Sequence, residues 1–162
     1  MTVRKIAAEA GVNPSLVNRY FGSKDNLIRA VVERSQLRIA ARAVHMNDAR
    51  TGIGDVLKSL LAEKEFVAIL ARACLDDTLS GLPTGYHAMR GLLEHLTEES
   101  HGASADVVDP RIVVACLASM GLGYGLFGEF IRRGTQLEEW SDEEIEAGLI
   151  EVSRRIVDMV QG

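Results

Sequence analysis

The sequence predicts an all-α protein, and three observations carry that prediction. Stretches in which polar and apolar residues alternate are scarce, and aromatic residues make up only 5% of the chain, so strands are not indicated. Apolar residues instead recur at spacings of three and four along most of the 162 residues. Helix-capping residues stand ahead of several of these stretches. A hydrophobic fraction of 47% is enough for a buried core.

The first residues predict two short helices. Thr2 is placed to cap a helix that ends at Gly11. Asn13 is placed to cap the next helix, which runs to about Tyr20. That helix begins at Pro14, where the missing backbone N–H costs nothing.

Two short helices joined by a glycine-containing turn form the helix-turn-helix pattern of DNA-binding proteins. We expect Gly11 to take the left-handed backbone conformation that the turn needs, and Val12 to fill the angle between the helices. The second helix would then lie in the major groove of duplex DNA. A helical hairpin with a purely structural role has the same spacing, so the pattern alone leaves both interpretations open.

The chain after Tyr20 predicts a series of amphipathic helices. Gly52 and Gly54 are expected to interrupt the chain before one of them. Asp109 is a capping residue followed by proline, and Ser141 begins a capping box of the form S-x-x-E. The predicted helices cover about residues 23–44, 56–61, 66–79, 86–97, 110–133 and 141–160, with loops at 80–83 and 100–108.

Charge is unevenly distributed along the chain. The net charge of −5 argues mildly against a nucleic-acid partner. However, residues 1–50 hold 9 lysines and arginines against 4 acidic residues, whereas residues 51–162 hold 9 against 19. Such a split indicates a basic module that faces a polyanion, joined to an acidic body. Ordinary solvated helix charge is the alternative, and charge alone does not decide between the two.

The N-terminal segment contains a recognisable set of short motifs. A threonine precedes the first helix, and the motifs Ile6-Ala7, Gly11-Val12, Tyr20-Phe21 and Ser23-Lys24-x-x-Leu27 follow in register. With these features the segment closely resembles the DNA-binding signature of the TetR (tetracycline repressor) family. The resemblance covers about the first 30 residues, and the helical remainder has the length and architecture usual for the family. It implies a helix-turn-helix followed by a helical-bundle domain for ligand binding and dimerisation.

The resemblance also implies roles for individual residues. Thr2 and Lys24 are expected to contact phosphates, the first at a helix N-terminus and the second as a point charge. Arginine suits guanine and asparagine suits adenine in the major groove, and we expect Tyr20 to pack its ring and offer its hydroxyl to a phosphate. Core roles are assigned to Ile6, Leu16, Val17 and Phe21. The predicted DNA-binding residues are Thr2, Arg4, Asn13, Ser15, Asn18, Arg19, Tyr20 and Lys24.

One departure from the family concerns the start of the sequence. The family normally carries a further helix ahead of this motif, which completes a three-helix DNA-binding unit. Without it, apolar groups of Ile6, Val12, Leu16 and Val17 would lose contacts worth on the order of several kcal/mol, at ~25 cal/mol per Å². We therefore expect an incomplete three-helix unit, and weaker operator binding than with that helix restored.

The last two helices, residues 110–133 and 141–160, fit the four-helix bundle through which TetR-like subunits dimerise. Ile112 to Gly128 carries no charge, but it is shorter than the ~20 residues that span a membrane, so we expect a buried helix and no membrane partner. Residues 123–128 match G-x-G-x-x-G, but no strand precedes them, so a dinucleotide site is not indicated.

The remaining candidate site is an apolar effector pocket between helices. The four histidines lack metal-binding spacing, and no triad or carboxylate pair stands out. We therefore expect no metal, no cofactor and no catalytic residue. A plain hydrophobic core has the same stripes of apolar residues and is the alternative. The predicted lining is Phe66, Leu70, His87, Met89, Arg90, Leu93, Met120, Tyr124 and Phe127.

These observations predict a cytoplasmic DNA-binding regulator, a repressor that a small molecule releases from its operator. Residues 1–45 would form the DNA-binding region with its connecting helix, and residues 46–162 the ligand-binding and dimerisation domain. A truncated dimer, impaired in DNA binding and acting as a ligand- or partner-binding module, is the alternative; an enzyme is the weakest hypothesis. Cys74 and Cys116 are expected to be buried, reduced thiols.

Overall fold

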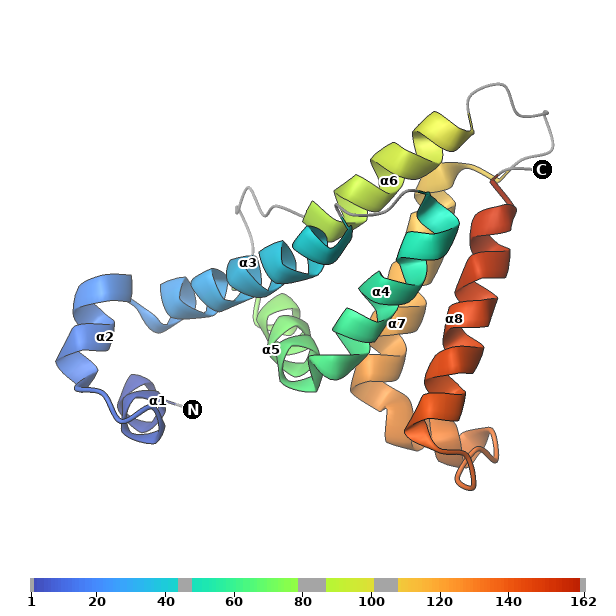
Figure 1. Ribbon diagram of the computed structural model, residues 1–162. Coiled ribbons are helices and arrows are strands. Elements are labelled where there is room, and N and C mark those ends of the chain that lie inside the picture. Colours follow the sequence, from blue (N-terminus) through green and yellow to red (C-terminus); the bar gives the residue numbers. More distant parts are fainter. Residues whose placement is uncertain (1, 44–47, 79–86, 101–107, 161–162) are drawn as a thin grey trace.

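The computed structural model describes residues 2–43, 48–78, 87–100 and 108–160, and every regular element within these ranges is a helix. The predicted all-α fold is therefore confirmed. In Figure 1 the first two short helices stand away from a helical body, and the long third helix joins them to it. The helices are α1 (Val3–Glu9), α2 (Pro14–Phe21), α3 (Lys24–Ala43), α4 (Ala49–Ala62), α5 (Lys64–Leu75), α6 (His87–Glu99), α7 (Pro110–Gly134) and α8 (Asp142–Asp158).

The last two helices begin where the sequence predicts. The Asp109 carboxylate accepts a hydrogen bond from the Arg111 backbone N–H at 2.8 Å and caps α7. Ser141 and Glu144 form a complete capping box at the start of α8. The Glu144 N–H donates to Ser141 Oγ at 3.2 Å, and the Ser141 N–H donates to Glu144 Oε2 at 2.8 Å. Each bond satisfies an N–H that the helix itself leaves without a partner.

The expected break at Gly52 and Gly54 is wrong, because both glycines lie inside α4. The helix begins at Ala49, after Asp48 accepts a hydrogen bond from the Thr51 N–H at 2.7 Å. Gly54 serves close packing instead, since a Cβ atom there would lie 3.4 Å from Cγ2 of Ile150 in α8.

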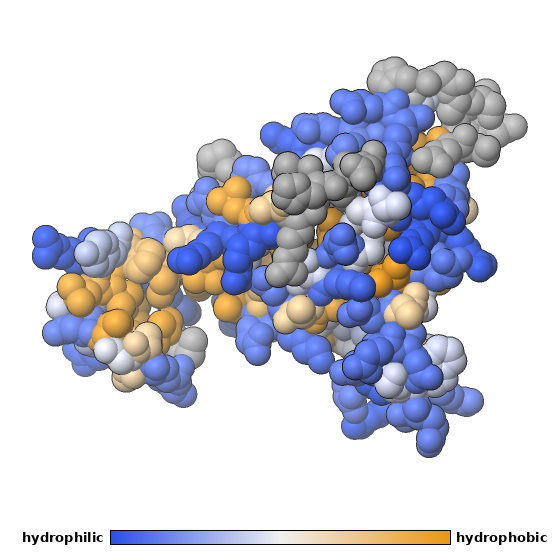
Figure 2. Space-filling view, in the orientation of Figure 1, coloured by the Kyte–Doolittle hydropathy of each residue, from blue (hydrophilic) through white to orange (hydrophobic). Residues whose placement is uncertain are grey.

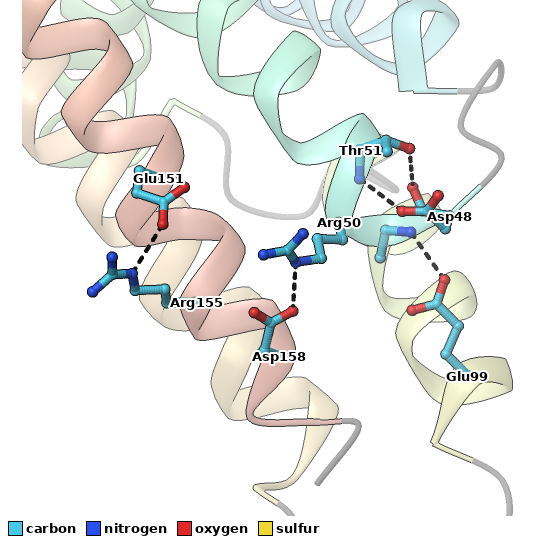
Figure 3. Close-up of polar contacts among 8 residues, drawn as sticks. Asp48, Arg50, Thr51, Glu99, Glu151, Arg155 and Asp158 are labelled. Carbon is cyan, nitrogen blue, oxygen red and sulfur yellow. Dashed lines mark hydrogen bonds and ion pairs between the residues drawn. The ribbon is translucent and has the colours of Figure 1, made fainter.

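Polar contacts fix the start of α4 between two other helices (Figure 3). The Ala49 N–H donates to the Glu99 carboxylate of α6 at 2.9 Å. Arg50 Nε donates to Asp158 of α8 at 2.7 Å, and both side chains are partly exposed. Exposed ion pairs add little stability, so these contacts set the register of α4 more than they hold the body together.

The core consists of two clusters of buried side chains. The larger joins α4, α6, α7 and α8 through Ala49, Ile53, Leu92, Leu96, Val113, Val114, Leu117, Val157 and Val160. The smaller joins α3 to α5 through Val32, Ile39, Phe66 and Val67. The C-terminal half of α3 is therefore part of the body, although its N-terminal end carries α1 and α2.

Helix α7 is buried on one side only, which corrects the expectation of a buried helix. Val113, Val114, Leu117 and Gly121 face the body. On the other side, Ile112 and Phe127 are more than half exposed, and Phe130 is 78% exposed. By length and composition α7 is apolar enough to cross a membrane, and 22% of its most apolar window is buried. The G-x-G-x-x-G residues lie in its middle, with no strand ahead of them in the described chain.

Both cysteines are free thiols, but they are exposed and not buried as expected. Cys74 lies near the end of α5, and Cys116 lies on the outer side of α7, four residues after the exposed Ile112. Helical periodicity identifies their helices as apolar but does not show which side meets the body.

Candidate nucleic-acid interface

The turn between α1 and α2 is a Schellman motif, in which two N–H groups beyond the helix return to its last carbonyls. The Val12 N–H donates to the Ala7 oxygen at 2.9 Å, and the Gly11 N–H donates to the Ala8 oxygen at 3.2 Å. Gly11 has a φ of 66°, the left-handed conformation that the sequence predicts there. The motif ends α1 sharply and redirects the chain into α2.

The two short helices pack through a small contact. Ala7 is fully buried, and Val17 is 9% exposed. The expected role of Val12 is wrong, since its side chain is 43% exposed and does not fill the angle between the helices. Ala7 and Val17 are instead the buried residues of α1 and α2. Leu16 is also 43% exposed, and Figure 2 shows hydrophobic residues gathered at this end of the molecule.

Side-chain caps hold the N-termini of both helices. Thr2 Oγ1 accepts from the Lys5 N–H at 3.3 Å at the start of α1. At the start of α2, Asn13 Oδ1 accepts from the Ser15 N–H at 2.9 Å and from Ser15 Oγ at 2.8 Å. The Ser15 hydroxyl therefore donates within the protein, and its oxygen remains available as an acceptor.

A second set of bonds fixes α2 against α3. Gly22 takes a positive φ of 72° between them. Ser23 Oγ accepts from the Asn26 N–H at 3.1 Å, and Asn26 Nδ2 donates to the Phe21 oxygen at 3.0 Å. The orientation of α2 is thus tied to the N-terminal end of α3.

All eight predicted DNA-binding residues are exposed on this module. Tyr20 is 79% exposed, so its ring does not pack as expected, although its hydroxyl is accessible. Arg4, Arg19 and Lys24 form no ion pair with any residue that the structure describes. Several arginines of the body, in contrast, are paired with carboxylates. The cations of the module are therefore free to neutralise phosphates.

A separate cavity of about 90 Å³, partly open to solvent, lies between the helices of the body. Its wall comes from α3, α4, α5, α6, α7 and α8 and is almost wholly apolar. Three of the predicted residues, Phe66, Leu70 and Met89, line it. Gln36 and Ile39 were not predicted to line it, because their helix was assigned to the DNA-binding region. The lining residues are Gln36, Ile39, Ile53, Val56, Leu57, Leu60, Phe66, Leu70, Ala88, Met89, Leu92, Val114, Leu117, Ala118, Leu122 and Ser153.

The other predicted pocket residues lie elsewhere. His87 and Arg90 line an open groove beside α3 and α6. Tyr124 lines another groove, where burial raises the pKa of its hydroxyl. Leu93 and Met120 pack against the larger core cluster. Phe127 is 56% exposed on the outer side of α7.

The module consists of two short helices joined by a turn that hydrogen bonds hold in place, and its cations form no ion pair with any described residue. This arrangement is typical of the helix-turn-helix class of DNA-binding proteins. Residues 1–31 match the family model of the bacterial regulatory proteins of the tetR family. The first 31 residues are thus similar to those regulatory proteins.

Curated relatives carry names of the same class. Over 159 residues the chain is 28% identical to the HTH-type transcriptional repressor Rv3405c of Mycobacterium tuberculosis. The alignment covers 97% of this chain and 78% of that relative. The HTH-type transcriptional regulator Mb3439c of Mycobacterium bovis matches with the same identity and coverage. Both relatives are thus named as transcriptional regulators of the helix-turn-helix type.

Proposed function

We propose that the protein is a cytoplasmic repressor that binds operator DNA as a homodimer and is released by a small molecule held in the body. The observation that carries the proposal is the exposed α1–α2 module with unpaired cations, standing on an otherwise acidic chain. The name of one relative, a transcriptional repressor, supports repression as the direction of control.

The outer side of α7 and α8 supports the homodimer. Apolar side chains are exposed along both helices, although both pack against the body on the other side. A Cβ atom at Gly123 or Gly148 would meet no atom within 4 Å, so a second pair of helices has room to approach. The exposed apolar side chains are Ile112, Leu126, Phe127, Phe130, Val152 and Met159. A two-fold dimer through these helices presents two copies of α2 to two half-sites.

The cavity supports release by a ligand. Gln36 and Ile39 of α3 belong to its wall, and the other end of α3 holds α2 through Ser23 and Asn26. A ligand that binds one position of α3 more tightly than another shifts the dimer between states with different half-site spacing. The size of the shift is limited by that difference in affinity.

Selection of duplexes from a random pool, followed by gel shift on the enriched site, tests the DNA-binding part of the proposal. We expect an inverted repeat to be enriched. Arg19→Ala should weaken binding to it by about 5- to 150-fold, as loss of one base contact does. Arg72→Ala, an exposed arginine of α5 paired with Asp76, is the matched control and should bind as the parent does.

Two results would argue against this assignment. One is the absence of any enriched sequence, and the other is an equal loss of affinity in the Arg19 and Arg72 variants. A chain that dimerises but binds no duplex would favour the alternative, a partner- or ligand-binding module without DNA function.

A further inference from the structure

One polar side chain stands out in the apolar cavity. Gln36 is 8% exposed and lies in the cavity wall. No hydrogen bond joins its amide to any other residue that the structure describes. No fully buried side-chain nitrogen or oxygen of the described residues lacks a partner, so the amide atoms of Gln36 keep accessible surface at which a ligand group can bind. Its neighbour Ser35 is also buried, but it accepts a hydrogen bond from Arg38 at 3.1 Å.

The other residues of the cavity wall decide whether a charged ligand can bind. The only other polar lining residue is Ser153, whose hydroxyl already donates to the Leu149 oxygen at 2.8 Å. No lysine, arginine, histidine, aspartate or glutamate is among the lining residues. An ionised ligand would lose its water without meeting an opposite charge, which costs far more than apolar contact returns.

The volume of the cavity limits the size of the ligand. An apolar cavity of about 150 Å³ holds benzene, and the present cavity measures about 90 Å³. A single ring therefore enters if the wall yields slightly. Met89 is the lining residue best suited to yield, because its unbranched side chain adapts to the space available. Larger ligands would have to separate the helices.

We propose that the cavity takes a small, uncharged, mainly hydrocarbon molecule with one hydrogen-bonding group, such as a phenol, and that Gln36 binds that group. The inference rests on the proposed function, because it names the chemistry of the effector at that site. The amide offers both a donor and an acceptor, so it pairs with a hydroxyl. The remaining wall contacts the ring.

Three probes of similar size test the proposal on the full chain: p-cresol, toluene and benzoate. Their dissociation constants are measured from the methyl signal of Met89 in NMR titrations without DNA. We expect p-cresol to bind about 2- to 12-fold more tightly than toluene, as one net hydrogen bond provides. Benzoate should not bind.

Variants then separate the cavity from the amide. Gln36→Leu should abolish the preference for p-cresol and keep the affinity for toluene, and Gln36→Met serves the same purpose if the leucine variant does not fold. Ala118→Leu fills the cavity and should abolish binding of both probes. The proposal is overturned if the parent binds neither neutral probe, if benzoate binds as well as p-cresol, or if the preference survives in both Gln36 variants.

A gel shift with and without p-cresol distinguishes this inference from the proposed function. If p-cresol binds in a Gln36-dependent way but leaves operator affinity unchanged, ligand-controlled release fails and the chemistry of the cavity stands. If p-cresol does not bind while the operator is still recognised, the cavity inference fails and the DNA-binding assignment stands.

Discussion

Gly121 of α7 lies so close to Leu60 of α4 that a Cβ atom on the glycine would stand 2.7 Å from Leu60 Cδ2. It would also lie 3.2 Å from Leu57 Cδ1. Both distances are shorter than ordinary van der Waals contact. The glycine therefore allows the two helices to approach closely, and a larger residue would make the leucine side chains move.

Gly121→Ala should be less stable than the same change at an open helical glycine. Alanine in place of a helical glycine gains about 0.5–1 kcal/mol, and a Cβ atom on Gly91 of α6 would meet no neighbour within 4 Å. We expect Gly91→Ala to raise the free energy of unfolding by that amount. The free energy of unfolding of Gly121→Ala should be at least about 1 kcal/mol lower than that of Gly91→Ala, because the leucines must move. Urea unfolding measures both. Equal stabilisation in the two variants would contradict the close contact.

Gly11→Ala should loosen the turn between α1 and α2. Gly11 has a φ of 66°, which costs an alanine about 1–2 kcal/mol. Gly11→Asn should recover much of the loss, because asparagine tolerates this conformation. Hydrogen exchange of the Val12 N–H, which donates to the Ala7 oxygen at 2.9 Å, reports on the turn directly. Equal exchange rates in the alanine and asparagine variants would show that backbone conformation does not limit the turn.

The cap of α7 should make stability depend on acid pH. The Arg111 side chain and backbone N–H hold the pKa of Asp109 at about 2, below its ordinary value of 3.8. The pKa of Asp109 is lower in the folded chain than in the unfolded chain, so the ionised carboxylate stabilises the fold. Its contribution to the free energy of unfolding is complete above about pH 3.8 and is lost as the pH falls towards about 2. Asp109→Asn keeps a capping oxygen and should show a smaller loss of stability across this window. High salt should reduce the difference, since the pair is exposed. If the free energy of unfolding falls equally with pH in the parent and in Asp109→Asn, the Asp109 carboxylate is not the cause of the acid dependence.

Val152→Glu should weaken the proposed dimer. Val152 is 47% exposed on the outer side of α8, where a partner would bury it. An unpaired carboxylate costs several kcal/mol in such a place. Sedimentation velocity should show more monomer at the same concentration. Leu75→Glu is the control, because Leu75 is 82% exposed at the end of α5 and is not part of the proposed α7–α8 interface. If the two variants sediment alike, the dimer uses another surface.

Local chemistry in the sequence predicts where helices begin more reliably than which way they face. The caps at Asp109 and Ser141 act through bonds to residues two or three positions away, so a short stretch of sequence contains all the information. Gly54 shows the opposite case, because its reason is Ile150 on another helix. A glycine that permits packing and a glycine that ends a helix look the same in sequence.

The predicted pocket shows the same limit. On α7, Met120 and Tyr124 were predicted to line the cavity, whereas Val114, Leu117, Ala118 and Leu122 line it. Successive residues of a helix are turned by about 100°, so a prediction that is wrong by one or two positions selects residues that face other neighbours, as Met120 faces the larger core cluster. Helix α7 is apolar on almost every side, and its contacts with α4, α5, α6 and α8 decide which side is inside. The exposed DNA-binding module was easier to predict because its motif is short and contiguous.

Helix α3 places the cavity wall and the DNA-reading end on one rigid rod. About 15 residues separate Ile39 from Lys24, which corresponds to about 22 Å along the helix axis. A tilt of about 5° at the wall would move the far end by about 2 Å, and two such rods in a dimer would change the reach by up to about 4 Å on a half-site spacing of about 34 Å. Under the proposed release mechanism the protein works as a lever, in which a displacement smaller than one methyl group inside the body becomes a mismatch of about one base-pair step at the DNA.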